Sequence, residues 1–353
     1  VKIPILRQVV GFVYLTFVLG LVFLSILRIN KLTLVEMVVY CIGLSLTFLM
    51  FIGFTINSLL PLIGISNPIS EKFLTFIIFT SISLLCILLY IKNDKFKLSL
   101  PSLKDVIHPI SLLFSLLPFI AVIGAHQLNY NNDNSILIIL YVLISITPLL
   151  IISNIAPTRL FSFILWTCSV SLLLSITLSL RYLSYYQGDT TLEYYFADLV
   201  YRNGIWDPSI TSNCNAMLRI VMLHPIYALL LNMDLLNVFR VVHPLLYSFT
   251  PVALYAAFRK QTNEKIAFLS VYFFISVFTF YVVLSRSTRT GIAEFFLALF
   301  VLLLISEFEN KDKVRKTMLL ILFAFSVAVS HYGTSYLFML TMITSFLFLN
   351  LFF

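Results

Sequence analysis

Apolar runs about as long as the roughly 20 residues that a helix needs to cross a bilayer dominate this chain. They recur along nearly all of the 353 residues, and only 11% of the residues are charged, too few for the surface of a water-soluble domain. No segment shows the alternation of a membrane β-barrel. The sequence therefore predicts an all-α polytopic membrane protein. About eleven spans are expected, at 9–28, 35–58, 72–91, 109–126, 136–153, 160–182, 239–258, 266–285, 290–306, 317–331 and 334–352.

Orientation follows from the short basic loops, because Lys and Arg favour the cytoplasmic side. Segments 92–104, 259–265 and 306–316 are the basic ones, so we place them in the cytoplasm. The long connection 183–238 and the short segment 285–291 then lie on the extracytoplasmic face of a multi-pass protein of the cell membrane. The formal net charge of +8 is explained by loops that face anionic lipid, and no nucleic-acid partner is needed.

The apolar segment 217–236 is a conflicting case. If it crossed the membrane, the basic loops after it would move to the outside. It also carries Arg219, His224 and Pro225, which a lipid-exposed crossing helix tolerates poorly. We therefore predict a helix here, or a pair broken before Pro225, that lies in or dips into the outer interface.

Acidic residues gather in the external connection, in the stretch QGDTTLEYYFADLVYRNGIWDP at 187–208. A helix is predicted from Asp189 to the stop signal Gly204, and its spacing places Asp189 and Glu193 on one face. Two like charges on one face bind a cation or keep one carboxyl protonated, as in general acid–base catalysis. The alternative is that Asp189 only caps the helix and Glu193 is a solvated first-turn acid.

A second polar element is SRSTRTG at 285–291, where Arg286 and Arg289 stand three residues apart at the start of a helix. Guanidiniums, hydroxyls and a helix N-terminus together suit a phosphate. The alternative is that both arginines extend to lipid head groups. His331, in SHYGTS, is predicted to lie on the same face, where it donates to a phosphate or an acceptor or is simply an interfacial histidine.

These segments resemble the GT-C superfamily of glycosyltransferases that use lipid-phosphate sugars. The matching stretches are GDTTLEYYFADLVYRNGIWDP, LHPIYALLLNMDLLNVFRVVHPLLYS and SRSTRTGIAEFF, within residues 155–353. With SHYGTSYLFM they are also similar to an uncharacterised family of archaeal predicted membrane proteins. The resemblance implies an N-terminal helical module at 1–153 and a catalytic module at 154–353. Many superfamily members carry adjacent acids in this loop, whereas three residues separate the two acids here.

The resemblance implies transfer of a sugar, with inversion, from a polyprenyl-phosphate donor to an extracytoplasmic glycan, lipid or protein acceptor. Asp189 matches the catalytic acid and is predicted to be the base, with Glu193 as its partner or the second choice. A requirement for a divalent cation, Mg or Mn, is left open. The other predicted substrate-binding residues are Arg286 and Arg289 for the phosphate, His331, and His224, which either forms a cavity wall or packs against the spans. The rings of Tyr194 and Trp206 either stack on sugars or anchor the chain at the interface.

Two other functions are compatible with this layout. One is a transporter or flippase of lipid-linked or anionic solutes, although the charges are predicted to gather at the outer ends of the spans and the halves show no repeat. The other is a GT-C-like scaffold without catalytic activity.

Overall fold

The structure, a computed structural model, describes residues 4–29, 32–91, 107–178, 189–286, 288–308 and 312–352. Within these ranges the chain is helical and has no strand, which confirms the predicted all-α class. The basic loop 92–104 and the first part of the external connection, 183–188, lie outside the described residues.

The helices follow in this order: α1 (Pro4–Val13), α2 (Leu19–Leu27), α3 (Leu34–Leu59), α4 (Glu71–Ile91), α6 (Pro109–Ser115), α7 (Leu117–Asn131), α8 (Ser135–Ile152), α9 (Phe161–Thr177), α10 (Asp189–Asn203), α11 (His224–Leu231), α12 (Leu235–Asn237), α13 (His243–Tyr247), α14 (Phe249–Phe258), α15 (Glu264–Ser276), α16 (Thr288–Ile305), α17 (Lys313–Ser330) and α18 (Tyr332–Phe352). Wider π turns cover Tyr14–Val18, Arg219–Leu223, Val238–Val242 and Thr279–Val283, and 3-10 turns cover Leu60–Ile63 and Thr158–Leu160.

Nine helices of the described chain are long and apolar enough to cross a membrane: Ile5–Leu27, Leu34–Ile63, Glu71–Ile91, Pro109–Asn131, Ser135–Ile152, Thr158–Thr177, Leu235–Phe258, Thr288–Ile305 and Tyr332–Leu351. Each coincides with a predicted span, so the protein has the helices of a multi-pass membrane protein.

The two remaining predicted spans take other forms. The segment predicted at 266–285 is interrupted, because α15 ends at Ser276, Val277 is extended, and a π turn follows. The segment predicted at 317–331 is the continuous helix α17, which begins with Lys313, Arg315 and Lys316. The count of eleven crossings stays a prediction.

Residues 219–231 form one continuous apolar helix, shorter than a span, and Pro225 does not break it. The π turn Arg219–Leu223 precedes Pro225 and widens the helix where the proline ring and its missing N–H would disturb a regular turn. Every residue from 219 to 228 is buried. The predicted helix is therefore present, but it is packed inside the protein.

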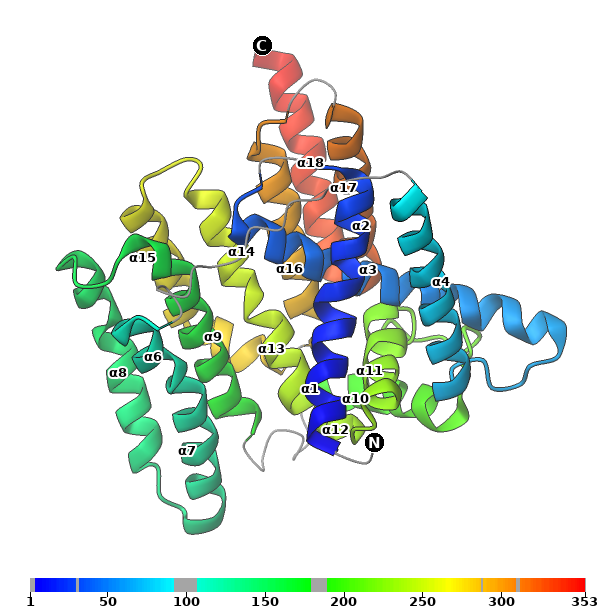
Figure 1. Cartoon of the computed structure of the whole chain (residues 1–353), viewed down its shortest axis with the longest axis horizontal. Coiled ribbons are helices and arrows are strands. Elements are labelled where there is room, and N and C mark those ends of the chain that lie inside the picture. The colour runs from blue at the N-terminus through cyan, green and yellow to red at the C-terminus, as the bar shows by residue number, and fades with distance from the viewer. Residues whose placement is uncertain are drawn as a thin grey trace.

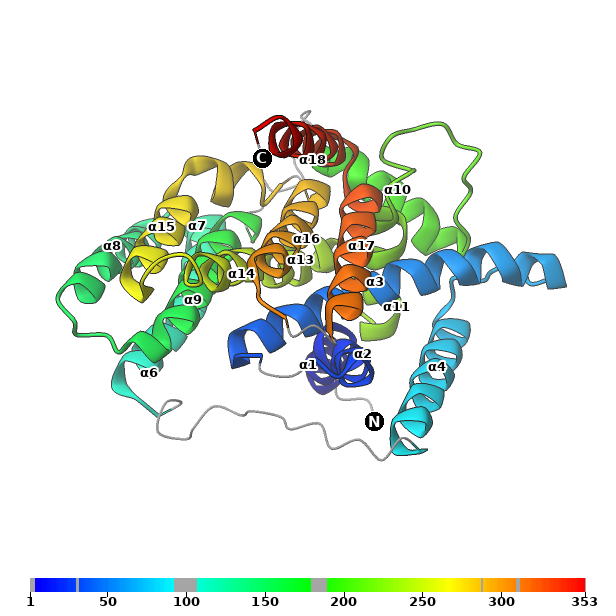
Figure 2. The same ribbon diagram turned by 90° about the horizontal axis from the view of Figure 1, so that it is seen from above.

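Two hydrophobic cores hold the helices together. The larger one joins α1–α4 to α10–α12, α16 and α17, and the second joins α6–α9 to α13 and α15, while α14 contributes to both. Figures 1 and 2 show α6–α9 on one side, α4, α10 and α11 on the other, and α14 and α16 between them. The predicted module boundary at 153/154 stays a prediction.

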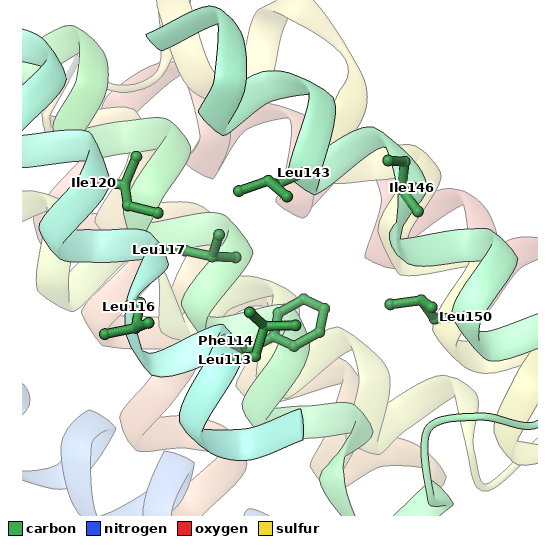
Figure 3. A pocket seen from close by; sticks show the side chains of 8 residues that line it. All are labelled: Leu113, Phe114, Leu116, Leu117, Ile120, Leu143, Ile146 and Leu150. Carbon is green, nitrogen blue, oxygen red and sulfur yellow. The ribbon is translucent and has the colours of Figure 1, made fainter. Parts of the chain in front are cut away.

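An apolar groove lies between α6 and α7 on one side and α8 on the other (Figure 3). It has a volume of about 190 Å³, and all eight lining side chains are apolar, among them Leu113, Leu116 and Ile146. These three are also well exposed. Such a surface suits hydrocarbon contact, which agrees with a lipid-facing position for these helices.

The packing of α2 on α3 depends on Gly20. Its N–H donates to Ser45 Oγ at 2.7 Å, and an added Cβ would lie 1.8 Å from the carbonyl oxygen of Cys41. The two backbones therefore approach too closely for any side chain.

We predict that Gly20→Ala lowers the free energy of unfolding by about 3 kcal/mol or more, because the backbone of α3 cannot move away without losing core contacts. The measurement is thermal unfolding of the purified protein in detergent. Gly11→Ala is the matched control, since its added Cβ meets only the flexible end of Leu231. Equal melting temperatures for the two variants would contradict the prediction.

Candidate functional site

The first turn of α10 contacts the first turn of α16, which brings both predicted acids to one arginine. Arg289 Nη2 lies 2.7 Å from Asp189 Oδ1, and Arg289 Nε lies 3.6 Å from Glu193 Oε1. The helical spacing of four residues places both carboxylates on the same side of α10, as predicted. Repulsion between these carboxylates is offset by the guanidinium that lies between them.

The two acids differ in exposure. The side chain of Asp189 is 55% exposed, whereas those of Glu193 and Arg289 are 0% and 6% exposed. Asp189 is therefore the carboxylate that a ligand from outside can reach, and Glu193 lies beneath it. This arrangement makes Asp189 more than a simple helix cap and makes Glu193 a buried acid instead of a solvated one.

Glu193 caps the start of α16. Its Oε2 accepts a hydrogen bond of 3.1 Å from the backbone N–H of Thr288 and a second one from the Thr288 hydroxyl. Burial raises the pKa of Glu193 to about 7, although the Thr288 hydrogen bond and the charges of Arg219 and Arg289 oppose the shift. The α16 terminus, which was predicted to favour an anion, is thus capped by a carboxyl group of the chain itself.

The other contacts of the Arg289 guanidinium are also with groups of the protein. Nη1 donates to Cys214 Sγ at 2.7 Å, and the guanidinium carbon lies 5.8 Å from the centre of the Tyr332 ring. Arg286 is different, because its side chain is exposed. Its carbonyl accepts from the Thr190 hydroxyl, which fixes the backbone of Arg286 against the first turn of α10.

His331 lies between α17 and α18 and caps α18. Its Nδ1 accepts from the backbone N–H of Thr334 at 3.3 Å, so its ring proton is on Nε2. Burial lowers the pKa of His331, the charge of Arg289 lowers it further, and Asp189 acts in the opposite direction. The structure thus brings His331 within electrostatic range of Asp189 and Arg289, as a neutral ring at neutral pH.

A deeper polar cluster lies on the two His-Pro segments. Arg219 is 1% exposed and contacts both ring nitrogens of His224, at 2.9 and 2.7 Å, and His243 Nδ1 at 2.7 Å. Burial and the charge of Arg219 lower the pKa of His224, so this ring is neutral and accepts from the guanidinium. This buried cluster was not expected from the sequence, and the predicted gathering of charges at the outer ends of the spans stays a prediction.

The three predicted lining residues His224, Tyr194 and Trp206 have packing contacts. His224 stacks on Phe239 with 3.7 Å between ring centres, and Tyr194 meets the same ring edge-on at 5.6 Å. The backbone N–H of Trp206 donates to Asn57 Oδ1, its carbonyl accepts from Asn57 Nδ2, and its indole N–H donates to Asn215 Oδ1. His224 is buried at 2% exposure, while the two other rings are partly exposed, and their substrate-binding roles stay predictions.

The sequence reasoning missed three contributors to this region. His243 and Arg219 are signalled by the paired patterns RIVMLHP and FRVVHP, each of which places His-Pro after a π turn. Cys214 carries no sequence signal that separates it from the other cysteines. Its role depends on the loop fold that places its sulfur beside Arg289.

A divalent cation does not fit between the two carboxylates. Arg289 fills that position, and the described part of the chain holds no group of three or more His, Cys, Asp or Glu side chains placed to bind a metal. A guanidinium supplies the positive charge at this site, so no chemical step is assigned to a metal.

Comparison of the chain with family models, with curated proteins and with solved structures finds no match. The geometry of the site is therefore the basis for the functional argument.

We predict that Glu193 makes the protein less stable as the pH rises from about 4.5 to about 7. In this window the folded state keeps a proton on Glu193 that the unfolded state has lost, so stability present at low pH declines by up to about 1.4 kcal/mol per pH unit. Glu193→Gln removes this contribution. The melting temperature of the variant minus that of the parent protein should therefore increase as the pH rises through the same window.

The control is Glu307→Gln at an exposed position, for which the difference in melting temperature should not change with pH. A constant difference for Glu193→Gln as well would contradict a raised pKa at Glu193.

Proposed function

We propose that the protein is a membrane glycosyltransferase that moves a sugar from a polyprenyl-phosphate donor to an extracytoplasmic glycan, lipid or protein acceptor. One observation carries the proposal: the exposed carboxylate of Asp189 is held at 2.7 Å by the buried guanidinium of Arg289. A fixed carboxylate with one accessible side is what an acceptor hydroxyl needs for deprotonation during attack. The GT-C-like layout of the three motifs supports the same reaction.

In the proposed reaction the acceptor oxygen attacks the anomeric carbon from the side opposite the phosphate. The bond between the anomeric carbon and the phosphate oxygen breaks, its electron pair leaves with the polyprenyl phosphate, and the acceptor proton passes to Asp189. Glu193 and Arg289 are positioning residues here, because both are buried and contact Asp189 or its partner.

Arg286 is the better candidate of the two arginines for the donor phosphate. The guanidinium of Arg289 already serves Asp189, Glu193 and Cys214, whereas the Arg286 side chain is exposed beside the first turn of α10. A cation there offsets charge that develops on the leaving phosphate. His331 is proposed to donate from Nε2 to the same phosphate or to the acceptor.

Transport of an anionic or lipid-linked solute is the second candidate function, and the deep cluster favours it. Arg219, His224 and His243 are buried on helices interrupted by π turns, a pattern found at substrate and proton sites of carriers. Glycosyl transfer remains the first choice because the exposed carboxylate lies at the helix ends, where a lipid-linked donor has access.

We predict that Asp189→Asn reduces sugar transfer about 100-fold or more, since a positioned base contributes that much. The amide oxygen keeps an acceptor for Arg289, so folding is retained. Transfer is measured in membranes supplied with polyprenyl-linked donor, with Asp198→Asn on the same helix as the control. Full transfer by Asp189→Asn would falsify the assignment of the base. Parent protein that moves solute across liposomes without transferring sugar would instead favour the carrier.

For the phosphate contact, we predict that Arg286→Gln raises the KM for the donor about tenfold, because one charge-assisted hydrogen bond is lost. The value of kcat should fall less. Arg202→Gln is the control, since Arg202 is an exposed arginine on α10 that pairs with Asp198 at 2.7 Å. An unchanged donor KM in Arg286→Gln would exclude Arg286 from the phosphate site.

A further inference from the structure

A cavity of about 640 Å³ lies at the opposite end of the helix bundle from the Asp189–Arg289 pair. Its wall contains Thr33 at the start of α3, whereas the far end of α3 carries Asn57, which contacts Trp206 in the external connection. Glu36, next to this wall, pairs with Lys260 at 2.5 Å. The cavity is therefore on the face predicted to be cytoplasmic.

Two arginines from different elements line this cavity. Arg159 comes from the turn before α9, and Arg259 follows the last residue of α14. Arg259 Nη2 donates to Thr33 Oγ1 at 3.3 Å, and its Nη1 lies 3.8 Å from Glu264 Oε1. Glu36 and Glu264 each lie beside a basic side chain, Lys260 and Arg259, and the guanidiniums of Arg159 and Arg259 both line the cavity.

Hydroxyl groups and apolar walls complete the lining. Ser111, Ser115 and Ser162 contribute hydroxyls, and Val35 and Phe163 belong to the apolar part. These residues stand at the starts of three helices that are long and apolar enough to cross a membrane. Two guanidiniums beside apolar side chains at the ends of membrane-length helices suit a lipid, because its charged head group is joined to an apolar chain.

The volume is within the 300–1,000 Å³ that is usual for small-molecule sites, roughly the space of a phosphate-bearing head group and the first part of its chains. We propose that this cavity binds the phosphate group of an anionic membrane lipid, with Arg159 and Arg259 on the phosphate and with Val35 and Phe163 against the hydrocarbon. This site is separate from the proposed transfer site, so each proposal stands or fails without the other.

The test measures binding of phosphatidic acid to the purified full chain by native mass spectrometry and by the rise in melting temperature. The parent protein should bind phosphatidic acid in preference to phosphatidylcholine. The double variant Arg159→Gln, Arg259→Gln should lose about tenfold or more in affinity, because two charge-assisted contacts are removed. Lys313→Gln is the control, since it removes an exposed positive charge at the start of α17.

If the double variant fails to fold, Arg159→Gln alone is used, because the Arg159 residue is exposed. Affinity for phosphatidic acid that matches the parent in these variants would overturn the proposal. Inorganic phosphate that binds as tightly as the lipid would also overturn it, since the site would then take a soluble anion. A similar loss in Lys313→Gln would show general surface attraction and count against a defined site.

Discussion

Ion pairing between the first turn of α10 and the start of α16 fixes the polar connection on the apolar helices. Arg289 is buried and touches both acids, so removal of either Arg289 or Glu193 would leave its partner without that contact in a region of low polarity, whereas Asp189 is half exposed. Removal of one partner from a buried pair costs about 3–5 kcal/mol. The same pairing leaves only Asp189 accessible, and the proposed chemistry depends on that asymmetry of exposure.

Burial of Arg219 follows a different principle. Its guanidinium contacts two imidazole rings, which accept hydrogen bonds as neutral groups. Each His-Pro segment follows a π turn, and the two segments place their histidine rings beside one guanidinium. Both terminal nitrogens of Arg219 are thus hydrogen-bonded among apolar neighbours, where an unpaired polar group is costly, whereas His243 Nε2 has no hydrogen-bond partner in the described part of the chain.

Span positions were readable from the sequence because apolar length alone determines them, and all nine membrane-length helices of the described chain coincide with predictions. The spacing of Asp189 and Glu193 likewise fixed their common face. What the sequence could not give were contacts between distant segments. Glu193 as the cap of α16, Cys214 beside Arg289 and the burial of 217–228 all arise from tertiary packing, which no local pattern records.

The capping of α16 by Glu193 limits how a long lipid could enter. Lifting α10 away would strip the carboxylate from the Thr288 amide and leave the amino end of a core helix bare. The proposed polyprenyl-phosphate donor would therefore have to approach from the side, past the exposed edge of Asp189, while α10 stays in contact with α16. Anchorage of this kind limits how far α10 can open, and it keeps the Asp189 carboxylate at a constant position relative to the start of α16.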